Sequence, residues 1–308
     1  MNAGIIAGQM LVLALMMAAG YMAFRLKLVS EEGGRALSSL IINIFNPCLV
    51  VSSVLNKEVL YGPDMVMENM ILVILFFLIL IILSKVFTKL MRLEKGEVNT
   101  YRLMMIFPNL GFMGIPLVRS LYGEEAVIFV AFYIMGYNLL VYSYGIILAT
   151  SGEGDTKISI PWKKLCNTGL MACLTAVVVF AFHIHVPSIL ADFVNAMGDA
   201  TVPLSMLMVG ITVAQSDLKS IFTDRKQILF VIINMIMIPL LCIVPLRLLP
   251  IDPMSYGIFI LLLAMPVGSV VTMVEKEYGS TGGRISAGAI AFTSVVSVIT
   301  IPIITFFA

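Results

Sequence analysis

This sequence of 308 residues carries little charge. Asp, Glu, Lys and Arg make up 12% of it, whereas apolar residues make up 60% and the mean hydropathy is +1.05. A soluble domain has about 25% charged residues. The formal net charge of +1 gives no sign of a basic surface for nucleic acid. The composition therefore excludes an ordinary soluble protein and predicts a helical protein that crosses the membrane many times.

The sequence is also poor in residues that mark metal, redox and hydrolytic sites. Its four cysteines are scattered and show neither disulfide nor zinc spacing. We find no phosphate-binding loop, and no nucleophile with a base or metal set within the apolar segments, as an intramembrane enzyme requires. We therefore expect no cofactor, no metal and no enzymatic activity. The first apolar run, 3–24, has no basic stretch before it and is long enough to span, so we expect it to be the first transmembrane helix rather than a cleavable signal peptide.

No Asp or Glu lies deep in an apolar segment. Glu275 and Glu277 come nearest, and both stand close to the end of one such segment. Buried carboxylates normally mark proton relays and ion pathways in membrane proteins. The sequence thus gives no indication of a deep carboxylate relay.

Apolar runs of about 20 residues, long enough to cross a bilayer, recur along the whole chain. Short segments with Gly, Pro, Asn and charged residues separate them. We expect ten spans, at 3–24, 36–55, 67–90, 100–121, 125–149, 167–186, 196–215, 227–249, 255–276 and 283–307.

The distribution of Lys and Arg supports this count. Fifteen of the 19 basic residues lie in the turns after spans 1, 3, 5, 7 and 9, and three, Lys57, Arg119 and Arg247, lie on the opposite side. Cytoplasmic loops of membrane proteins are enriched in Lys and Arg. We therefore expect a multi-pass protein of the cell membrane with both termini outside.

The longest polar segment, 150–167, falls near the middle of the chain. It divides the sequence into two halves, 1–155 and 156–308, with five spans each. Because five is an odd number, the second half enters the membrane in the opposite direction to the first. The sequence therefore predicts an inverted repeat.

Prolines recur at matching places in the two halves. Pro47 and Pro108 lie in the second and fourth spans, and Pro203 and Pro266 lie in the corresponding spans of the second half. Proline breaks or kinks a helix. A single proline is typical of a simple kink, but symmetric pairing beside glycines favours interrupted helices, which mark substrate sites in transporters. The N–H groups that begin a half-helix carry partial positive charge and attract anions.

Several polar residues stand beside these breaks. Asn109 follows Pro108 directly, Asn46 precedes Pro47, and Tyr137 and Asn138 lie in the middle of span 5. Hydrogen bonding between helices is the ordinary role of such residues. An amide beside a broken helix also donates to a carboxylate without adding charge, which favours Asn109 as a ligand. We expect an anion site at Asn46, Pro108, Asn109, Gly111, Tyr137, Asn138, Pro266, Val267, Gly268 and Ser269.

Three segments resemble the auxin efflux carrier family, which includes plant carriers and bacterial dicarboxylate carriers. The segment PNLGFMGIPL, from Pro108 to Leu117, is similar to the crossover motif of the family's fourth helix. The segment from Met265 to Tyr278 is similar to the crossover motif of its ninth helix, and GYNLL, from Gly136 to Leu140, to a stretch of its fifth.

The resemblance implies an all-α membrane fold of ten helices, in two inverted repeats of five, with helices 4 and 9 broken where they cross. It implies a scaffold of spans 1, 2, 6 and 7 and a transport domain of spans 3–5 and 8–10. It further implies an elevator-like motion and a homodimer joined through the scaffold. By the same resemblance, Asn109 holds the substrate carboxylate and Tyr137 lines the site.

We therefore expect a secondary carrier of small organic anions, auxin- or dicarboxylate-like, embedded in the lipid bilayer. The related bile acid sodium symporters carry an acidic residue and a glutamine at the ninth-helix crossing, where this chain reads AMPVGS from Ala264 to Ser269. Sodium coupling is therefore not indicated. Two alternatives stay open: a sodium-coupled symporter of the bile acid type, and a membrane receptor that kept the carrier fold without turnover.

Overall fold

The computed structural model describes residues 3–52, 54–55, 62–94, 96–150, 168–182, 184–216, 223–277 and 283–308, and nearly all of them are helical. The expected boundary between the two halves, at residue 155, lies outside these ranges. The described helices, with π-helical turns labelled η, are α1 (Ala3–Arg25), α2 (Glu31–Leu40), η1 (Ile41–Phe45), α3 (Asn46–Ser52), α4 (Pro63–Leu90), α5 (Val98–Ile106), η2 (Leu110–Gly114), α6 (Ile115–Tyr122), α7 (Val127–Leu140), η3 (Val141–Gly145), α8 (Ile146–Thr150), α10 (Thr168–Phe182), α11 (Ser188–Gln215), α13 (Arg225–Ile232), η4 (Ile233–Met237), α14 (Ile238–Arg247), α15 (Pro253–Leu263), α16 (Val270–Glu277) and α17 (Gly283–Phe307).

Ten apolar helical segments occur among the described residues, but only some are long enough to cross a membrane alone. Six qualify by length and composition: Glu31–Ser52, Pro63–Leu90, Val127–Thr150, Ser188–Gln215, Arg225–Arg247 and Ile285–Phe307. Four shorter ones lie where the remaining spans were expected, at Met10–Arg25, Leu110–Tyr122, Thr168–Phe182 and Pro253–Leu263. The helical membrane class is thus confirmed, while the count of ten spans and the inverted repeat stay predictions.

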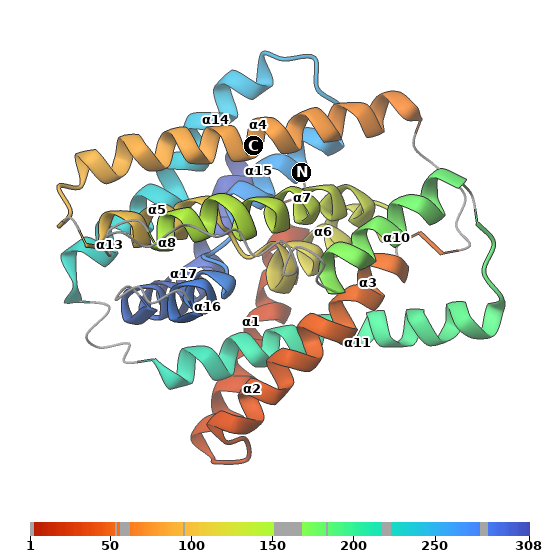
Figure 1. Ribbon diagram of the computed structural model, residues 1–308, viewed down its shortest axis with the longest axis horizontal. Helices are drawn as coiled ribbons and strands as arrows, with labels where there is room; N and C mark the ends of the chain where they lie inside the picture. The colour runs from red at the N-terminus through yellow and green to blue at the C-terminus, as the bar shows by residue number, and fades with distance from the viewer. Residues whose placement is uncertain are drawn as a thin grey trace.

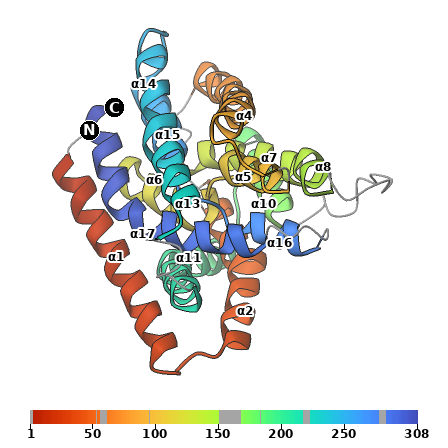
Figure 2. The ribbon, with the colours of Figure 1, turned by 90° about the vertical axis from the view of Figure 1, so that its left-hand side faces the viewer.

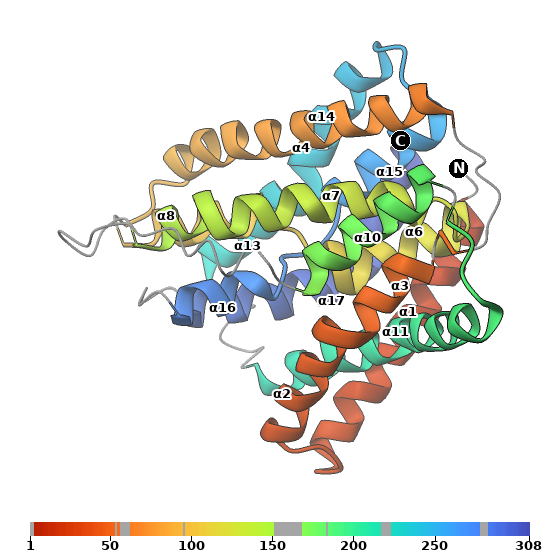
Figure 3. The same cartoon turned by 45° about the vertical axis from the view of Figure 1, so that its right-hand side comes forward.

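The helices form an elongated assembly with the broken crossings in its interior. The long helices α4 and α11 lie on either side of α5, α7 and α15, with α14 extending beyond α4 and α2 beyond α11 (Figures 1 and 3). In the view turned by 90°, helix α17 lies between α1 and α16 (Figure 2). The two ends of the chain lie near each other in all three views.

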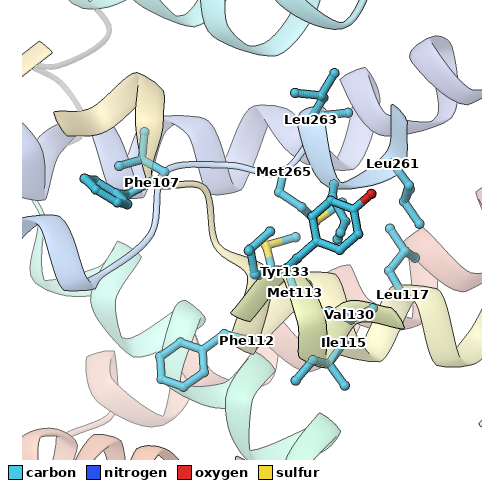
Figure 4. Packing of buried hydrophobic residues seen from close by; sticks show 14 of the residues in the cluster. Phe107, Phe112, Met113, Ile115, Leu117, Val130, Tyr133, Leu261, Leu263 and Met265 are labelled. Atoms are coloured by element: carbon cyan, nitrogen blue, oxygen red, sulfur yellow. The ribbon is translucent and has the colours of Figure 1, made fainter. Parts of the chain in front are cut away.

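Aromatic side chains fill the core between α4, α7 and α15. The ring of Phe76 contacts Tyr133 and Phe259 edge-on, with centroids 5.2 and 5.4 Å apart. Edge-to-face pairs of this kind stabilise a core beyond their buried area. The packing continues to the chain breaks, where Met113 and Met265 lie beside Tyr133 (Figure 4). The broken segments are therefore held in a closely packed apolar interior.

The four paired prolines have different effects on their helices. Helix α11 continues without interruption through Pro203, and Pro47 lies in α3, directly after the π-helical turn η1. A π turn already leaves a carbonyl without its usual donor, so the missing N–H of Pro47 costs little there. In contrast, α5 ends at Ile106 before Pro108, and α15 ends at Leu263 before Pro266. The expected breaks at Pro108 and Pro266 are present, and the second-span prolines interrupt nothing.

Helices α1 and α11 approach each other closely at two glycines. A Cβ atom at Gly20 would overlap the carbonyl oxygen of Leu207, and one at Gly210 would overlap the carbonyl oxygen of Met17. Small residues at an interface let membrane helices pack backbone against backbone. No larger residue fits at either position unless the two helices move apart.

We expect Gly20→Ala to lower the free energy of unfolding by about 1–3 kcal/mol, because the added methyl group meets backbone that cannot yield. Gly8→Ala is the matched control on the same helix, since nothing lies within 4 Å of its Cβ position. A thiol-reactive dye measures the unfolding temperature through exposure of the buried Cys173 and Cys242. Equal unfolding temperatures for the two variants would contradict the close packing.

Candidate functional site

The first broken crossing consists of three residues between α5 and η2. Phe107 leaves the helical conformation, with φ −116° and ψ 78°, and Asn109 has φ −80° and ψ 74°. Pro108 between them has no N–H to donate. The chain resumes helical geometry at Leu110, in the π-helical turn η2, and continues as α6. Non-helical backbone inside a membrane protein must find its hydrogen bonds within the protein.

The second broken crossing supplies those hydrogen bonds. Pro108 and Val267 form an antiparallel β-bridge. The N–H of Asn109 donates to Pro266 O at 2.7 Å, and the N–H of Gly268 donates to Phe107 O at 2.9 Å. The two breaks therefore satisfy each other, and both segments are non-helical at the same place.

A threonine of the last helix completes the second break. The N–H of Val267 donates to Thr293 Oγ1 at 3.1 Å, and that hydroxyl donates in turn to Ala289 O at 2.7 Å. Thr293 is fully buried. Thr293 is not among the site residues expected from the sequence. Its signal was a run of hydroxyl residues, Thr293, Ser294 and Ser297, inside the apolar segment of α17.

Asn109 has two separable roles at the crossing. Its Oδ1 accepts from the N–H of Phe112 at 3.0 Å and so caps the half-helix that begins at Leu110. The side chain is 6% exposed. None of the hydrogen bonds found among the described residues engages its Nδ2. Asn109 therefore keeps an amide donor beside the crossing after its cap is made.

The N-terminus of this half-helix offers fewer unbonded N–H groups to an anion than we expected from the sequence. The N–H groups of Asn109, Leu110 and Phe112 are bonded to Pro266 O, Pro108 O and the Asn109 side chain. The second half-helix does offer an N–H group to an anion, because the N–H of Ser269, just before α16, has no partner in the part of the chain that the structure describes. Ser269 is also half-buried.

Tyr137 and Gly268 lie against each other. A Cβ atom at Gly268 would be 2.8 Å from the Tyr137 hydroxyl, 2.9 Å from Phe107 O and 3.0 Å from Pro108 O. The ring of Tyr137 packs edge-on against Phe107, with centroids 5.4 Å apart. Helix α7 thus brings a hydroxyl group to the point where the two broken segments meet, as the expected site required.

The side chain of Asn46, on α3, lies beside the first broken crossing. A Cβ atom at Gly111 would lie 3.2 Å from Asn46 Nδ2, so the amide faces the start of η2. The Oδ1 of Asn46 is buried and has no hydrogen-bond partner among the described residues. A buried polar atom without a partner is rare in a folded protein and indicates a missing ligand, a water or a functional role.

Asn138 differs from the other expected site residues. Its Nδ2 donates to Ile134 O at 2.9 Å, one turn earlier in its own helix. That donor is therefore occupied, although Tyr137 beside it reaches the crossing. The structure brings together Pro108, Asn109, Pro266, Val267 and Gly268 at the bridge, with Ser269 next in the chain and Tyr137, Gly111 and Asn46 in contact around it.

Comparison with known proteins gives one consistent result. A family model described as a membrane transport protein matches residues 5–305. An uncharacterised transporter of Methanothermobacter thermautotrophicus is 23% identical over 286 residues, which cover 92% of each chain. An uncharacterised transporter of Methanocaldococcus jannaschii is 24% identical over 220 residues, 68% of this chain and 69% of that one. The matched range of the family model includes both broken crossings.

Proposed function

The chain belongs to the membrane transport protein family, and on this premise we propose that it is a secondary carrier of small organic anions. One observation carries the choice of substrate: the two broken crossings pair with each other, and the side-chain Nδ2 of Asn109 has no hydrogen-bond partner among the described residues. A carboxylate is the chemical group that such a donor binds, and helix ends accept it without a basic side chain.

The proposed site holds the carboxylate by neutral donors alone. Asn109 Nδ2 and the N–H of Ser269 donate to its oxygens, and the start of α16 adds the positive end of a helix dipole. The Tyr137 hydroxyl, at Gly268, binds the remainder of the molecule. Neutral donors suit a carrier, because a buried cation would hold the anion too strongly and would itself be costly in the membrane.

The motion that we propose is an elevator in which one group of helices slides past the other. The scaffold consists of α1, α2, α3, α10 and α11, and the transport domain contains the two crossings with α4, α7 and α17. The close packing of α1 on α11 at Gly20 and Gly210 supports a rigid scaffold. The aromatic contacts among Phe76, Tyr133 and Phe259 support a second rigid group.

An ion pair between these two groups gives a test of the elevator. The Arg119 guanidinium at the end of α6 contacts the carboxylates of Glu124 and of Asp199 on α11. Exposed pairs stabilise by up to about 1 kcal/mol. We therefore expect Asp199→Asn to shift the balance between two states by up to about fivefold, away from the arrangement described here.

Distances between spin labels at Leu90 and Ile189, both well exposed, measure this balance once the native cysteines are replaced by serine. Glu124→Gln is the control, because Glu124 lies next to α6 and its pair with Arg119 does not join the two groups. Elevator motion predicts a changed distance distribution for Asp199→Asn alone. Identical distributions for both variants would contradict it.

Flux into liposomes tests the proposed function itself. We expect saturable uptake of at least one radiolabelled carboxylate among acetate, pyruvate, malonate, succinate and indole-3-acetate, and none of ethanolamine, which is a cation of similar size. Uptake that requires sodium would favour the bile acid type of symporter. Binding without uptake would favour the receptor alternative, and neither binding nor uptake would contradict an organic-anion carrier.

A further inference from the structure

The structure contains a fully buried carboxylate that the sequence did not reveal as such. Glu275 lies on α16 and is 0% exposed. From the sequence it stood close to the end of its span, where a carboxylate normally meets water. A buried carboxyl group is costly when it is charged and is retained in membrane proteins for a function.

Hydroxyl groups from three helices surround this carboxylate. Ser286 of α17, fully buried, donates from Oγ to Glu275 Oε2. Thr100 of α5, 3% exposed, also makes a side-chain hydrogen bond to it. Thr272, one turn before Glu275, lies 2.8 Å from Ser286 in a hydrogen bond that either hydroxyl can donate. The direction of this chain of hydrogen bonds can therefore reverse.

Such a chain of hydroxyls suits a carboxyl group in both protonation states. The charged form accepts from Ser286 and Thr100. The protonated form needs an acceptor instead, and a hydroxyl that rotates provides it without movement of the backbone. A lysine or arginine in place of Ser286 or Thr100 would instead stabilise only the charged form of the Glu275 carboxyl group. The chain of hydroxyls can therefore hydrogen-bond to Glu275 both when its carboxyl group is protonated and when it is charged.

The carboxylate is attached to the crossing described above. Glu275 follows Val267 by eight residues, and Thr100 precedes Pro108 by eight. Because Pro108 and Val267 pair in antiparallel fashion, α5 and α16 leave the crossing on the same side, and they pack against each other. Glu275 and the candidate anion site are therefore carried by the same two segments of chain.

Helices α5, α8 and α17 pack against α16, and α13 packs against α17, so their ionisable groups are the ones nearest to Glu275 along the chain contacts. Arg102 on α5 donates from Nε to Thr88 Oγ1 at 3.3 Å, and Lys226 at the start of α13 binds Glu97 at 2.7 Å. Helix α8 has no ionisable residue. The remaining ones on these elements are Tyr101 on α5, Lys276 and Glu277 on α16, Arg284 on α17 and Arg225 on α13.

We propose that Glu275 binds and releases one proton in each transport cycle and so couples organic-anion movement to the proton gradient. A proton from water on one side bonds to a carboxylate oxygen, and the same O–H bond breaks on the other side, with no further reactant. The protonated form removes one negative charge from the segments that carry the anion. The inference rests on the proposed function for its coupling role, but the protonation itself is measurable without any substrate.

Infrared difference spectra of the reconstituted protein between alkaline and acid pH test the protonation. We expect a C=O stretching band of a buried carboxylic acid that Glu275→Gln removes. Glu94→Gln is the matched control, since its carboxylate is 82% exposed. Ser286→Ala is a second variant, which keeps the carboxyl group and should shift the band without removing it. Identical spectra for the unaltered protein and Glu275→Gln would overturn the proposal.

Uptake driven by a pH gradient tests the coupling, with whichever carboxylate of the liposome panel is taken up. One proton moving with a monoanion allows about tenfold accumulation for each unit of pH gradient. We expect Glu275→Gln to lose this accumulation and to retain exchange of labelled for unlabelled carboxylate. Accumulation by Glu275→Gln equal to that of the unaltered protein would overturn the coupling. Absence of all uptake in the unaltered protein would count against the proposed function, and the infrared result would still decide the protonation.

Discussion

The Asn109→Ala carrier is expected to bind carboxylates about 10- to 150-fold more weakly than the unaltered protein. A hydrogen bond to a charged group contributes about 1.5–3 kcal/mol, and alanine removes the Nδ2 donor that makes it. Alanine also removes the cap on Phe112, whose loss costs a further ~1 kcal/mol of stability. Equilibrium binding of radiolabelled carboxylate to the purified protein measures the first effect.

A second variant separates the cap from the donor. Asn109→Asp keeps an oxygen that caps η2, because aspartate caps as well as asparagine does, but it replaces the amide donor by a negative charge. We expect this variant to remain folded and to lose at least as much carboxylate affinity as Asn109→Ala. Asn43→Ala is the matched control, since Asn43 lies outside the expected site and its Nδ2 is already bonded to Ser39 O at 2.9 Å. Normal binding by Asn109→Asp would remove Asn109 from the site.

The Gly268→Ala variant should lose both stability and uptake. The added Cβ atom would lie 2.9 and 3.0 Å from the carbonyl oxygens of Phe107 and Pro108, which belong to the other broken segment. Those oxygens cannot retreat without breaking the hydrogen bond from Gly268 N–H to Phe107 O. Overpacking and loss of one hydrogen bond together amount to about 2–4 kcal/mol. The dye assay on the buried cysteines measures this loss.

A double variant that combines Gly268→Ala with Tyr137→Phe tests which of these contacts causes the loss. Removing the hydroxyl relieves the contact at 2.8 Å but leaves both backbone contacts in place. We therefore expect the double variant to be no more stable than Gly268→Ala alone. Gly62→Ala serves as the control, with nothing within 4 Å of its Cβ position. Full rescue by Tyr137→Phe would show that the crossing itself tolerates a side chain.

The membrane class, the family and the positions of the two helix breaks could be predicted from the sequence alone. The resemblance of the crossover motifs is confirmed by a family match that covers residues 5–305. Pro108 and Pro266 favour a break in their helices because each lacks a backbone donor, which is a local property of the residue. Pro203 shows the limit of that reasoning, since α11 continues through it. Proline permits a break, and tertiary packing decides whether one forms.

The contacts within the site depended on long-range pairing that a single sequence does not contain. The cap from Asn109 to Phe112 was missed, although it is local, because Asn109 was considered only as a ligand. Thr293 and the burial of Glu275 depend on how α17 and α5 pack over the second crossing, which no periodicity in α16 indicates. The assignment of the ten site residues to substrate binding stays a prediction.

The most direct measurement is a density map of the protein in lipid with the carboxylate that it transports. We expect the carboxylate group between Asn109 and Ser269, at the place where the segment around Pro108 pairs with the segment around Val267. A carboxylate bound elsewhere, or an occupied crossing whose Asn109 amide faces away from it, would contradict the account.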